Sequence, residues 1–402
     1  MSRLTEVTRE RLPKEQRRFY DAVKSIRGRP VSGPFIVLMN SSPDLAARFA
    51  HLGHYFHSRG QADEAPLPVR ARAFVSLVGS RALDAPYEFA AWIDTVREAG
   101  IPQETIDAIR EGKTPSLDAE EALIAKICGA LVSGDHRIDA ATFDAALAHF
   151  GPQQLVDLVS TLGYFAMIAL PLNAFEIAMT PKQIALRKPF TPLAVNGSPW
   201  TLNSETARAL PPLGSGHTAA PRVPLLTGHD DVAPEHQHFL DRVVRSRGWI
   251  SPAFAVLMHS ADAAERIAYV GSHLLYESAL PPAVRALVLL AGAREFDCAY
   301  TWRAAIDAAV AAGIDATVIQ AIEHGEGPAE IAPAALAVLD FCRQLMRGNH
   351  HVDESVYEAM TGHHGVPVAV LSAAMLGYVV MMSMIANAFD LAPDEAAPGP
   401  LL

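Results

Sequence analysis

Cysteine is scarce in this chain, and the paired motifs that usually accompany functional thiols are missing. The three cysteines are Cys128, Cys298 and Cys342; they lie far apart in the sequence and none belongs to a CxxC motif. An odd number of dispersed thiols argues against a disulfide framework and is typical of a reducing compartment. The first twenty residues or so are charged and lack the apolar core of a signal peptide. We therefore expect a cytoplasmic protein.

Positive charge is also in short supply. The sequence has 33 Lys and Arg residues against 44 Asp and Glu residues, which gives a net charge of −11. Binding to nucleic acid or to an anionic membrane surface normally requires a basic patch. Neither is an expected partner, and the acidic balance mainly favours solubility.

The alternating pattern of β-strands is nearly absent as well. Apolar residues instead recur at three-to-four spacing, as in ARFAHLGHYFHS and ERIAYVGSHLLYES. We therefore predict an all-α protein, with Asp84 and Asp297 as helix N-caps and with Gly100 and Gly313 at helix ends.

What the sequence does contain is an internal repeat, which is the strongest signal in it. The repeated segments keep the same order in both halves of the chain. Examples are FYDAVKSIRG at 19–28 and FLDRVVRSRG at 239–248, AGIPQETIDAIREG at 99–112 and AGIDATVIQAIEHG at 312–325, and LGYFAMIALPLNAF at 162–175 and LGYVVMMSMIANAF at 376–389.

The repeat divides the 402 residues into two tandem homologous helical-bundle domains. We place them at 1–185 and 225–395, joined by a Pro/Gly/Ser-rich linker at 186–224. The final stretch, APDEAAPGPLL, looks like a frayed tail.

Residues 369–389 are apolar over about the length of a bilayer span. The counterpart in the first half carries Asp157 and Pro171, so we predict that both are buried core helices and that no membrane is involved.

A spaced pattern in each half points to a known family. In the first half, Leu67-Pro68 and Arg81 precede Tyr87-Glu88 and then AGIPQETI; in the second, Leu280-Pro281 and Arg294 precede Tyr300-Thr301-Trp302 and then AGIDATVI. This pattern resembles the carboxymuconolactone decarboxylase family, which includes alkyl hydroperoxidase D, over nearly all of both halves. The resemblance implies an all-helical fold that decarboxylates without a cofactor and assembles as trimers or hexamers of single domains. A fused pair would then form a pseudo-dimer, and three chains a pseudo-hexamer.

The sequence differs from the family at the positions of the family's catalytic residues. The family's peroxidases use a CxxC and a later His, but the two Cys positions hold Ala85 and Glu88 in the first half, and Cys298 and Thr301 in the second. Without a dithiol, a disulfide-cycling peroxidase is not expected. The decarboxylase-like pattern Tyr-Glu-Trp-x-x-His is also incomplete, because Trp92 stands where the first half should have its His.

Glu88 is the leading catalytic candidate. It is predicted in the first turns of a helix and shares a face with Trp92 at i+4. A carboxyl group beside an indole has a raised pKa, which suits proton transfer near neutrality. The helix dipole opposes that shift, and the alternative is a solvated glutamate that merely complements the dipole.

The second half offers other candidates. Cys298 follows the predicted N-cap Asp297, where helix N–H groups favour a thiolate, and Glu295 lies three residues earlier. The alternative for Cys298 is a small buried thiol. His54 and His273 are candidates for proton transfer inside a helical pocket. We expect no metal, because His51, His54 and His57 drift around their helix and no carboxylate completes a ligand set.

Arg81 and Arg294 match between the halves, and each could hold a substrate carboxylate in a bidentate pair. The alternative is that these arginines tie helix ends together. Aromatic residues of the same motif would line the substrate pocket: Tyr87, Trp92, Tyr300 and Trp302.

From these residues and the resemblance, the leading hypothesis is a cofactor-independent lyase, decarboxylase-like, or an isomerase, acting by acid–base chemistry on a small carboxylated or lactone-like metabolite. One alternative is a thiol peroxidase that uses Cys298 alone, and another is a non-catalytic binding or scaffold protein. Two arrangements stay open: one half holds the active site while the other is structural, or a composite site lies between them. The expected partners are a small-molecule substrate and further copies of the chain.

Overall fold

A computed structural model describes residues 2–57, 67–132, 135–177, 220–325, 330–393 and 399–402, together with positions 179, 181, 184, 185, 190 and 213. Throughout these residues the regular structure is helical, and no strand occurs among them. The all-α prediction is therefore confirmed. Most of the predicted linker at 186–224 lies outside the described residues.

The helices of the first half run in the order α1 (Arg17–Arg27), α2 (Pro34–Met39), α3 (Pro43–His57), α4 (Val69–Ala82), α5 (Pro86–Glu98), α6 (Gln103–Arg110), α7 (Ala119–Val132) and α8 (Ala140–Ala174). Those of the second half are α10 (Gln237–Arg247), α11 (Pro252–Leu257), α12 (Ala261–Ser272), the π-helical turn η6 (His273–Glu277), α13 (Pro282–Glu295), α14 (Ala299–Ala311), α15 (Ala316–Glu323), α16 (Pro333–Met346), α17 (Glu354–His364) and α18 (Val366–Ala388).

The two series follow the same order once one bend is recognised. Helix α8 contains Gly151 at φ 68°, a backbone conformation that favours glycine, and Pro152 follows it. In the second half, Gly365 at φ 81° separates α17 from α18. A glycine in the left-handed region therefore breaks the long helix at the same place in each half.

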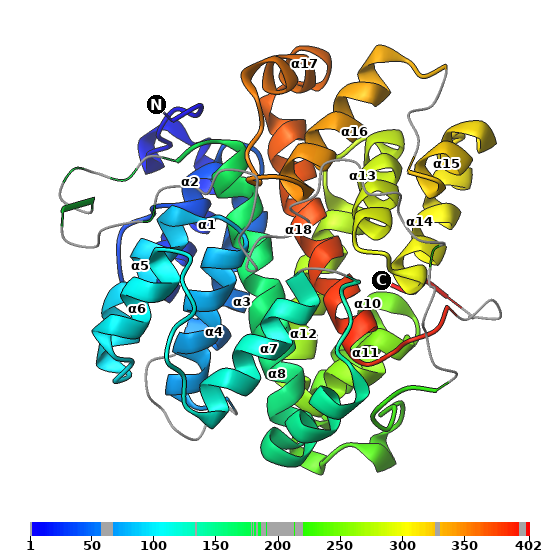
Figure 1. The fold of residues 1–402 in the computed structure, drawn as a ribbon. Coiled ribbons are helices and arrows are strands. Elements are labelled where there is room, and N and C mark those ends of the chain that lie inside the picture. The colour runs from blue at the N-terminus through cyan, green and yellow to red at the C-terminus, as the bar shows by residue number, and fades with distance from the viewer. Residues whose placement is uncertain are drawn as a thin grey trace.

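The long helices α8 and α18 cross at the centre of the molecule, with the blue-to-green helices of the first half on one side and the yellow-to-orange helices of the second on the other (Figure 1). Both are apolar and long enough to cross a membrane, which by itself is weak evidence for a span. Their most apolar stretches are 100% and 94% buried inside the protein. The two segments are thus core helices, as predicted from the presence of Asp157 and Pro171 in the first of them. The cytoplasmic location stays a prediction.

Glycine permits the close crossing of these two helices. A Cβ atom on Gly163 would lie 2.4 Å from Met381 Cγ, and a Cβ atom on Gly377 would lie 2.6 Å from Met167 Cα. Each helix therefore supplies a glycine at the crossing: Gly163 faces the Met381 side chain, and Gly377 faces the backbone of α8 at Met167. A side chain at Gly377 would meet backbone atoms, so this glycine determines how closely the two helices can approach.

Hydrogen bonds recur in matched pairs across the two halves. Arg48 donates to the carbonyl of Tyr269, and Arg266 donates to the carbonyl of His51. A second matched pair lies within the halves: Asn173 donates to Leu83 O and Asn387 donates to Phe296 O, at 2.9 and 3.0 Å.

Two local predictions about helix starts are wrong. Asp84 and Asp297 are not N-caps; both have left-handed φ angles, 47° and 45°, and both pair with an arginine at the end of the preceding helix. The N-cap positions of α5 and α14 are Ala85 and Cys298, with no capping side chain. Gly100 and Gly313, in contrast, do follow helix ends, at φ 78° and 73°.

The prediction of a frayed tail is wrong for its last residues. Leu401 and Leu402 are buried in the core, at 4% and 3% exposure. Residues 394–398 of the same stretch lie outside the described residues.

A buried carboxyl group lies where the two halves meet. Tyr55 donates to Asp157 at 2.9 Å, and Ser260 from the second half donates to the same carboxyl at 2.5 Å. Burial raises the pKa of Asp157 to about 7. The hydrogen bonds and the nearby Arg72 act in the opposite direction but do not cancel the burial, while the Asp262 carboxylate adds to it.

This carboxyl makes stability depend on pH. Between the ordinary pKa of an aspartate and about 7, the folded protein keeps a proton on Asp157 that the unfolded chain releases, so the contribution of this group falls as pH rises through that window. We expect Asp157→Asn to gain stability relative to the wild type as the pH goes from 5 to 8, measured by chemical denaturation. Asp144→Asn, on an exposed part of α8, is the matched control and should show no such trend. An unchanged difference for Asp157→Asn across this range would contradict the assignment.

Candidate functional site

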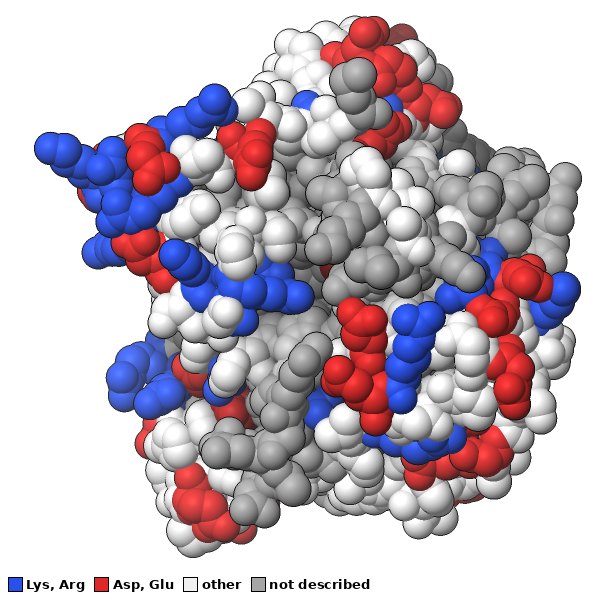
Figure 2. Space-filling model, turned by 90° about the vertical axis from the view of Figure 1, so that its left-hand side faces the viewer, with Lys and Arg blue, Asp and Glu red and all other residues white. Residues whose placement is uncertain are grey.

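A cavity of about 470 Å³ lies in the first half of the molecule. Its walls come from the end of α1 and the loop after it, from the start of α2, from α3, from the first turns of α5 and from the second half of α8. Acidic and basic side chains are interspersed over the face of the molecule shown in Figure 2.

Glu88 lies in the wall of this cavity and is only 6% exposed. It occupies the first turn of α5, which begins at Pro86, a residue suited to the first helical position. Burial raises the pKa of Glu88 to about 7, although Arg29, Arg27 and a hydrogen bond from the Trp92 indole all favour the charged form. Near neutral pH this carboxyl can therefore either donate or accept a proton.

Two arginines, one at the end of α1 and one just after it, line the same cavity. Arg27 lies over the Phe35 ring at 4.3 Å and donates to the carbonyl of Pro30 at 3.1 Å. Burial lowers the pKa of Arg27 to about 10, so it remains a cation at neutral pH. Arg29 also lines the cavity and is exposed at its other side. Both cations lower the pKa of His57, so they act on the same space.

His57, at the end of α3, also lines the cavity. Its ring stacks on Trp92, with centroids 4.6 Å apart, and its Nε2 lies 3.0 Å from the Tyr164 hydroxyl. Burial, followed by Arg29 and Arg27, lowers the pKa of His57 to about 3. The imidazole is therefore neutral under ordinary conditions and exchanges hydrogen bonds without carrying charge.

Small residues give these groups their positions. A Cβ atom on Gly53 would lie 2.4 Å from the Tyr164 hydroxyl, so the glycine lets this tyrosine reach α3. Gly33, at φ 61°, has the Tyr87 ring at 2.8 Å from where its Cβ would be. Both aromatic side chains line the cavity.

The structure brings together four of the residues predicted from sequence. Glu88, His54, Tyr87 and Trp92 all line the cavity. Of these, Glu88 is the one whose surroundings match the reason given for choosing it, a carboxyl group beside an indole. His54 is exposed at the surface of α3.

Arg81 and Arg294 are not at the cavity. Arg81 is fully buried, with its guanidinium 2.9 Å from Asp84 and over the Phe190 ring. Arg294 donates to the carbonyl of Glu323 at 2.5 Å and lies 3.5 Å from Asp297. The structure thus places both in the alternative role, in which an arginine ties helix ends together.

The catalytic candidates of the second half are also dispersed. Glu295 forms a bidentate pair with Arg347, at 2.7 and 2.6 Å. Cys298 is fully buried at the N-cap of α14, and burial raises the pKa of its thiol. The predicted thiolate is therefore wrong, because desolvation outweighs the hydrogen bonds of the helix N-terminus.

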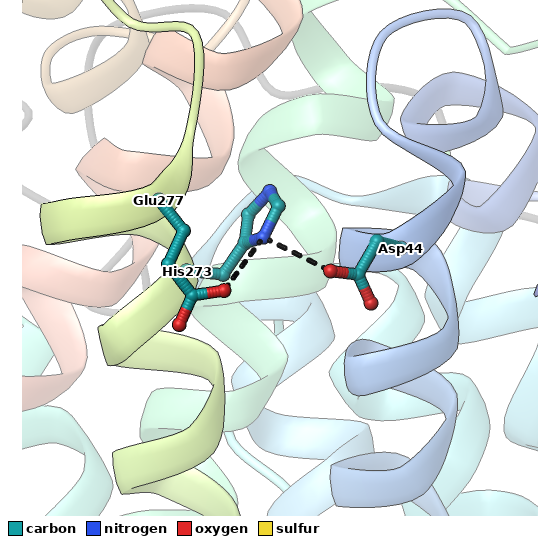
Figure 3. A group of neighbouring side chains, drawn as sticks. All are labelled: Asp44, His273 and Glu277. Atoms are coloured by element: carbon teal, nitrogen blue, oxygen red, sulfur yellow. Dashed lines mark ion pairs between the residues drawn. The ribbon is translucent and has the colours of Figure 1, made fainter. Parts of the chain in front are cut away.

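His273 lies at the interface between the halves. Its Nε2 is 2.9 Å from the Ser42 hydroxyl, and its Nδ1 faces Asp44 at 3.4 Å and Glu277 at 3.8 Å (Figure 3). Within the part of the chain that the structure describes, this trio has the spacing of a metal site. Arg48 already contacts both carboxylates, at 3.0 Å from Asp44 and 2.5 Å from Glu277. A cation there would meet a guanidinium, so we interpret the trio as an ion-pair network between α3 and η6.

Tyr300 and Trp302 are buried in the second half, at 0% and 4% exposure. The Tyr300 hydroxyl donates to Leu401 O at 3.0 Å and accepts from the backbone N–H of Ala253 at 3.3 Å. The Tyr300 hydroxyl, which was expected to contact a substrate, therefore bonds to another segment of the same chain.

Four polar residues of the cavity described above were not among the candidates chosen from the sequence: Arg27, Arg29, His57 and Tyr164. A signal existed for two of them. Arg27 and Tyr164 belong to repeated segments, SIRG and LGY, in which a polar side chain recurs beside apolar ones. Nothing in the repeat marks Arg29 or His57, because the second half differs at both positions.

Comparison with known proteins gave no match, whether to a protein-family model, to a curated protein or to a solved structure.

Proposed function

We propose that the first half of this protein is a cofactor-independent active site that transfers a proton on a small anionic metabolite, as a decarboxylase-like lyase or an isomerase. The observation that carries the proposal is Glu88: a carboxyl group in a cavity wall, with a pKa of about 7, facing a space that two arginines share. Cavities of this size, with a few convergent polar groups and a perturbed pKa, are typical of small-molecule sites.

The proposal also covers the architecture. The recurring helix order, the matched hydrogen bonds and the paired glycines support two copies of one helical unit. We propose that these copies form a pseudo-dimer of the carboxymuconolactone decarboxylase type, on the sequence pattern around Tyr87 and Tyr300. Assembly of three chains into a pseudo-hexamer stays a prediction from that resemblance.

In the proposed mechanism, Arg27 and Arg29 hold an anionic group of the substrate. When a carboxylate leaves as carbon dioxide, its bonding electrons stay on the substrate carbon, and the protonated Glu88 carboxyl delivers a proton there. In an isomerisation the same carboxyl, ionised, would first remove a proton from carbon and then return it elsewhere. Neutral His57, hydrogen-bonded to Tyr164, orients a polar group of the substrate without competing for the anion.

The other two hypotheses fit the geometry less well. A thiol peroxidase needs an accessible thiolate, and each of Cys128, Cys298 and Cys342 is buried with a raised thiol pKa. A non-catalytic role suits the second half, where Thr301 occupies the position that matches Glu88.

Anion binding by Arg27 gives a direct test. We expect Arg27→Met to weaken binding of small carboxylates by about tenfold or more, because it removes a charged hydrogen-bond donor from a partly desolvated site. The measurement is calorimetric titration with succinate, fumarate, cis,cis-muconate and a lactone carboxylate. Arg18→Met, on an exposed part of the same helix, is the matched control and should bind like the wild type. Equal affinities for wild type and Arg27→Met would contradict the anion-holding role.

A further inference from the structure

The second half has residues at the positions that match the cavity walls of the first half. Their correspondence follows from the repeated segments of the sequence. The matched pairs are Arg27 and Arg247, Arg29 and Trp249, Tyr87 and Tyr300, and Tyr164 and Tyr378. The local geometry is matched too, since Arg27 lies over Phe35 at 4.3 Å and Arg247 lies over Phe254 at 4.1 Å.

Where the first half keeps a cavity, residues 399–402 contact two of these matched positions, Trp249 and Tyr300, and also Tyr276. The Trp249 indole donates to Pro400 O at 3.0 Å, and the Tyr300 hydroxyl donates to Leu401 O at 3.0 Å. The Tyr276 hydroxyl donates to Leu402 O at 3.5 Å. Three side chains of the second half therefore donate hydrogen bonds to this segment, one to a main-chain oxygen of each of its last three residues.

The segment also fits by shape. Both leucines are at least 96% buried, since Leu401 is 4% exposed and Leu402 is 3% exposed. A Cβ atom on Gly399 would lie only 2.6 Å from Trp249 Cδ1, so the indole packs directly on glycine backbone. These contacts hold residues 399–402 in one register and leave no space for a side chain at position 399.

The second half has lost two groups of the matched wall, the carboxyl and the indole. Thr301 matches Glu88, and Ala305 matches Trp92. Replacing an indole by a methyl group removes a large aromatic side chain from that wall, and Ala305 is fully buried. The arginine of the matched wall is kept as Arg247, which donates to Ala268 O and to the Ser246 and Tyr378 hydroxyls.

We propose that the second half holds a peptide-binding pocket whose ligand is the chain's own segment at 399–402, recognised through its backbone carbonyls and its two leucines. The pocket is a receptor for a Gly-Pro-Leu-Leu sequence, and it is not a second active site. The proposal rests on the second half alone and does not depend on the role of Glu88.

Competition between the segment and an added peptide tests this. In the double variant Leu401→Asp and Leu402→Asp, two carboxylates would have to be buried, so the segment leaves the pocket. A fluorescently labelled peptide of residues 397–402, Ala-Pro-Gly-Pro-Leu-Leu, should then bind saturably, measured by fluorescence anisotropy. Wild-type protein should bind the same peptide at least tenfold more weakly, because its pocket is occupied. Adding Trp249→Ala to the double variant should weaken peptide binding, whereas adding Arg27→Met, in the first half, should not.

Failure of the double variant to bind the peptide, or equal binding by wild type and double variant, would overturn the proposal. A second measurement avoids the risk that the double variant folds poorly. In Trp249→Phe, which removes only the indole donor and some contact area, amide hydrogen exchange in peptides covering residues 391–402 should quicken while exchange in α8 and α18 stays the same. Unchanged exchange at 391–402 would count equally against the pocket.

Discussion

Replacing Glu88 by glutamine should lower turnover by about 100-fold or more, the usual range for removing a general acid or base. Glutamine keeps the size and polarity of the side chain in the cavity wall, but it cannot release or deliver a proton. Delivery to carbon requires the protonated carboxyl, so the proton-donating step should slow as the pH rises above about 7, the pKa that burial gives Glu88. The measurement is kcat and its pH profile on whichever small carboxylate the wild-type protein consumes.

The control for this experiment is Glu98→Gln, which changes an exposed glutamate at the end of the same helix and should leave turnover unchanged. The pH profile separates a chemical role from a structural one. If Glu88→Gln lost activity but its kcat still fell above about pH 7, that pH dependence would come from the ionisation of another group. Full activity in Glu88→Gln would remove the proposed mechanism altogether.

Substituting Gly377 by valine should destabilise the whole protein by about 3 kcal/mol or more, which is at the upper end for overpacking. The added Cβ atom would meet Met167 Cα at 2.6 Å and Ala166 O at 3.3 Å. Both contacts are backbone atoms of α8, which cannot rotate out of the way as a flexible side chain can. We expect the thermal unfolding midpoint to fall by roughly 3–4 °C or more.

Gly362→Ala is the matched control, because Gly362 also lies in a helix and a Cβ atom there would meet nothing within 4 Å. That substitution should leave stability unchanged or raise it by about 0.5–1 kcal/mol, since alanine loses less backbone entropy in a helix. A Gly377→Val protein as stable as the wild type would mean that α8 and α18 do not cross this closely.

The helical fold was open to prediction because its signal is local and repeated. Three-to-four spacing of apolar residues and the glycines at 100 and 313 predicted helices and helix ends correctly. The helix starts failed, since Asp84 and Asp297 each face an arginine of the preceding turn that lies three residues earlier. Such an ion pair competes with capping, and the sequence alone does not reveal which partner the carboxylate takes.

The cavity was only partly predictable, for a different reason. Glu88 and Trp92 lie on one helix, so their contact follows from i+4 spacing. Arg27 and His57 reach the same space from other helices, and no sequence spacing measures a distance between elements. The arginines chosen from the motif, Arg81 and Arg294, recur in both halves because both halves need the same buried pairs. The repetition of these arginines in both halves therefore indicated a structural role and not a catalytic one.

The close crossing of α8 and α18 makes the two halves mutually dependent. Gly163 of α8 leaves room for the Met381 side chain, and Gly377 of α18 leaves room for the backbone of α8. Neither half expressed by itself would have a surface suited to water, because the long central helix would present its apolar face to solvent. A polypeptide divided between residues 186 and 224 should therefore yield fragments that reassociate instead of two independent proteins. Change in either central helix during evolution is correspondingly tied to a compensating change in its partner.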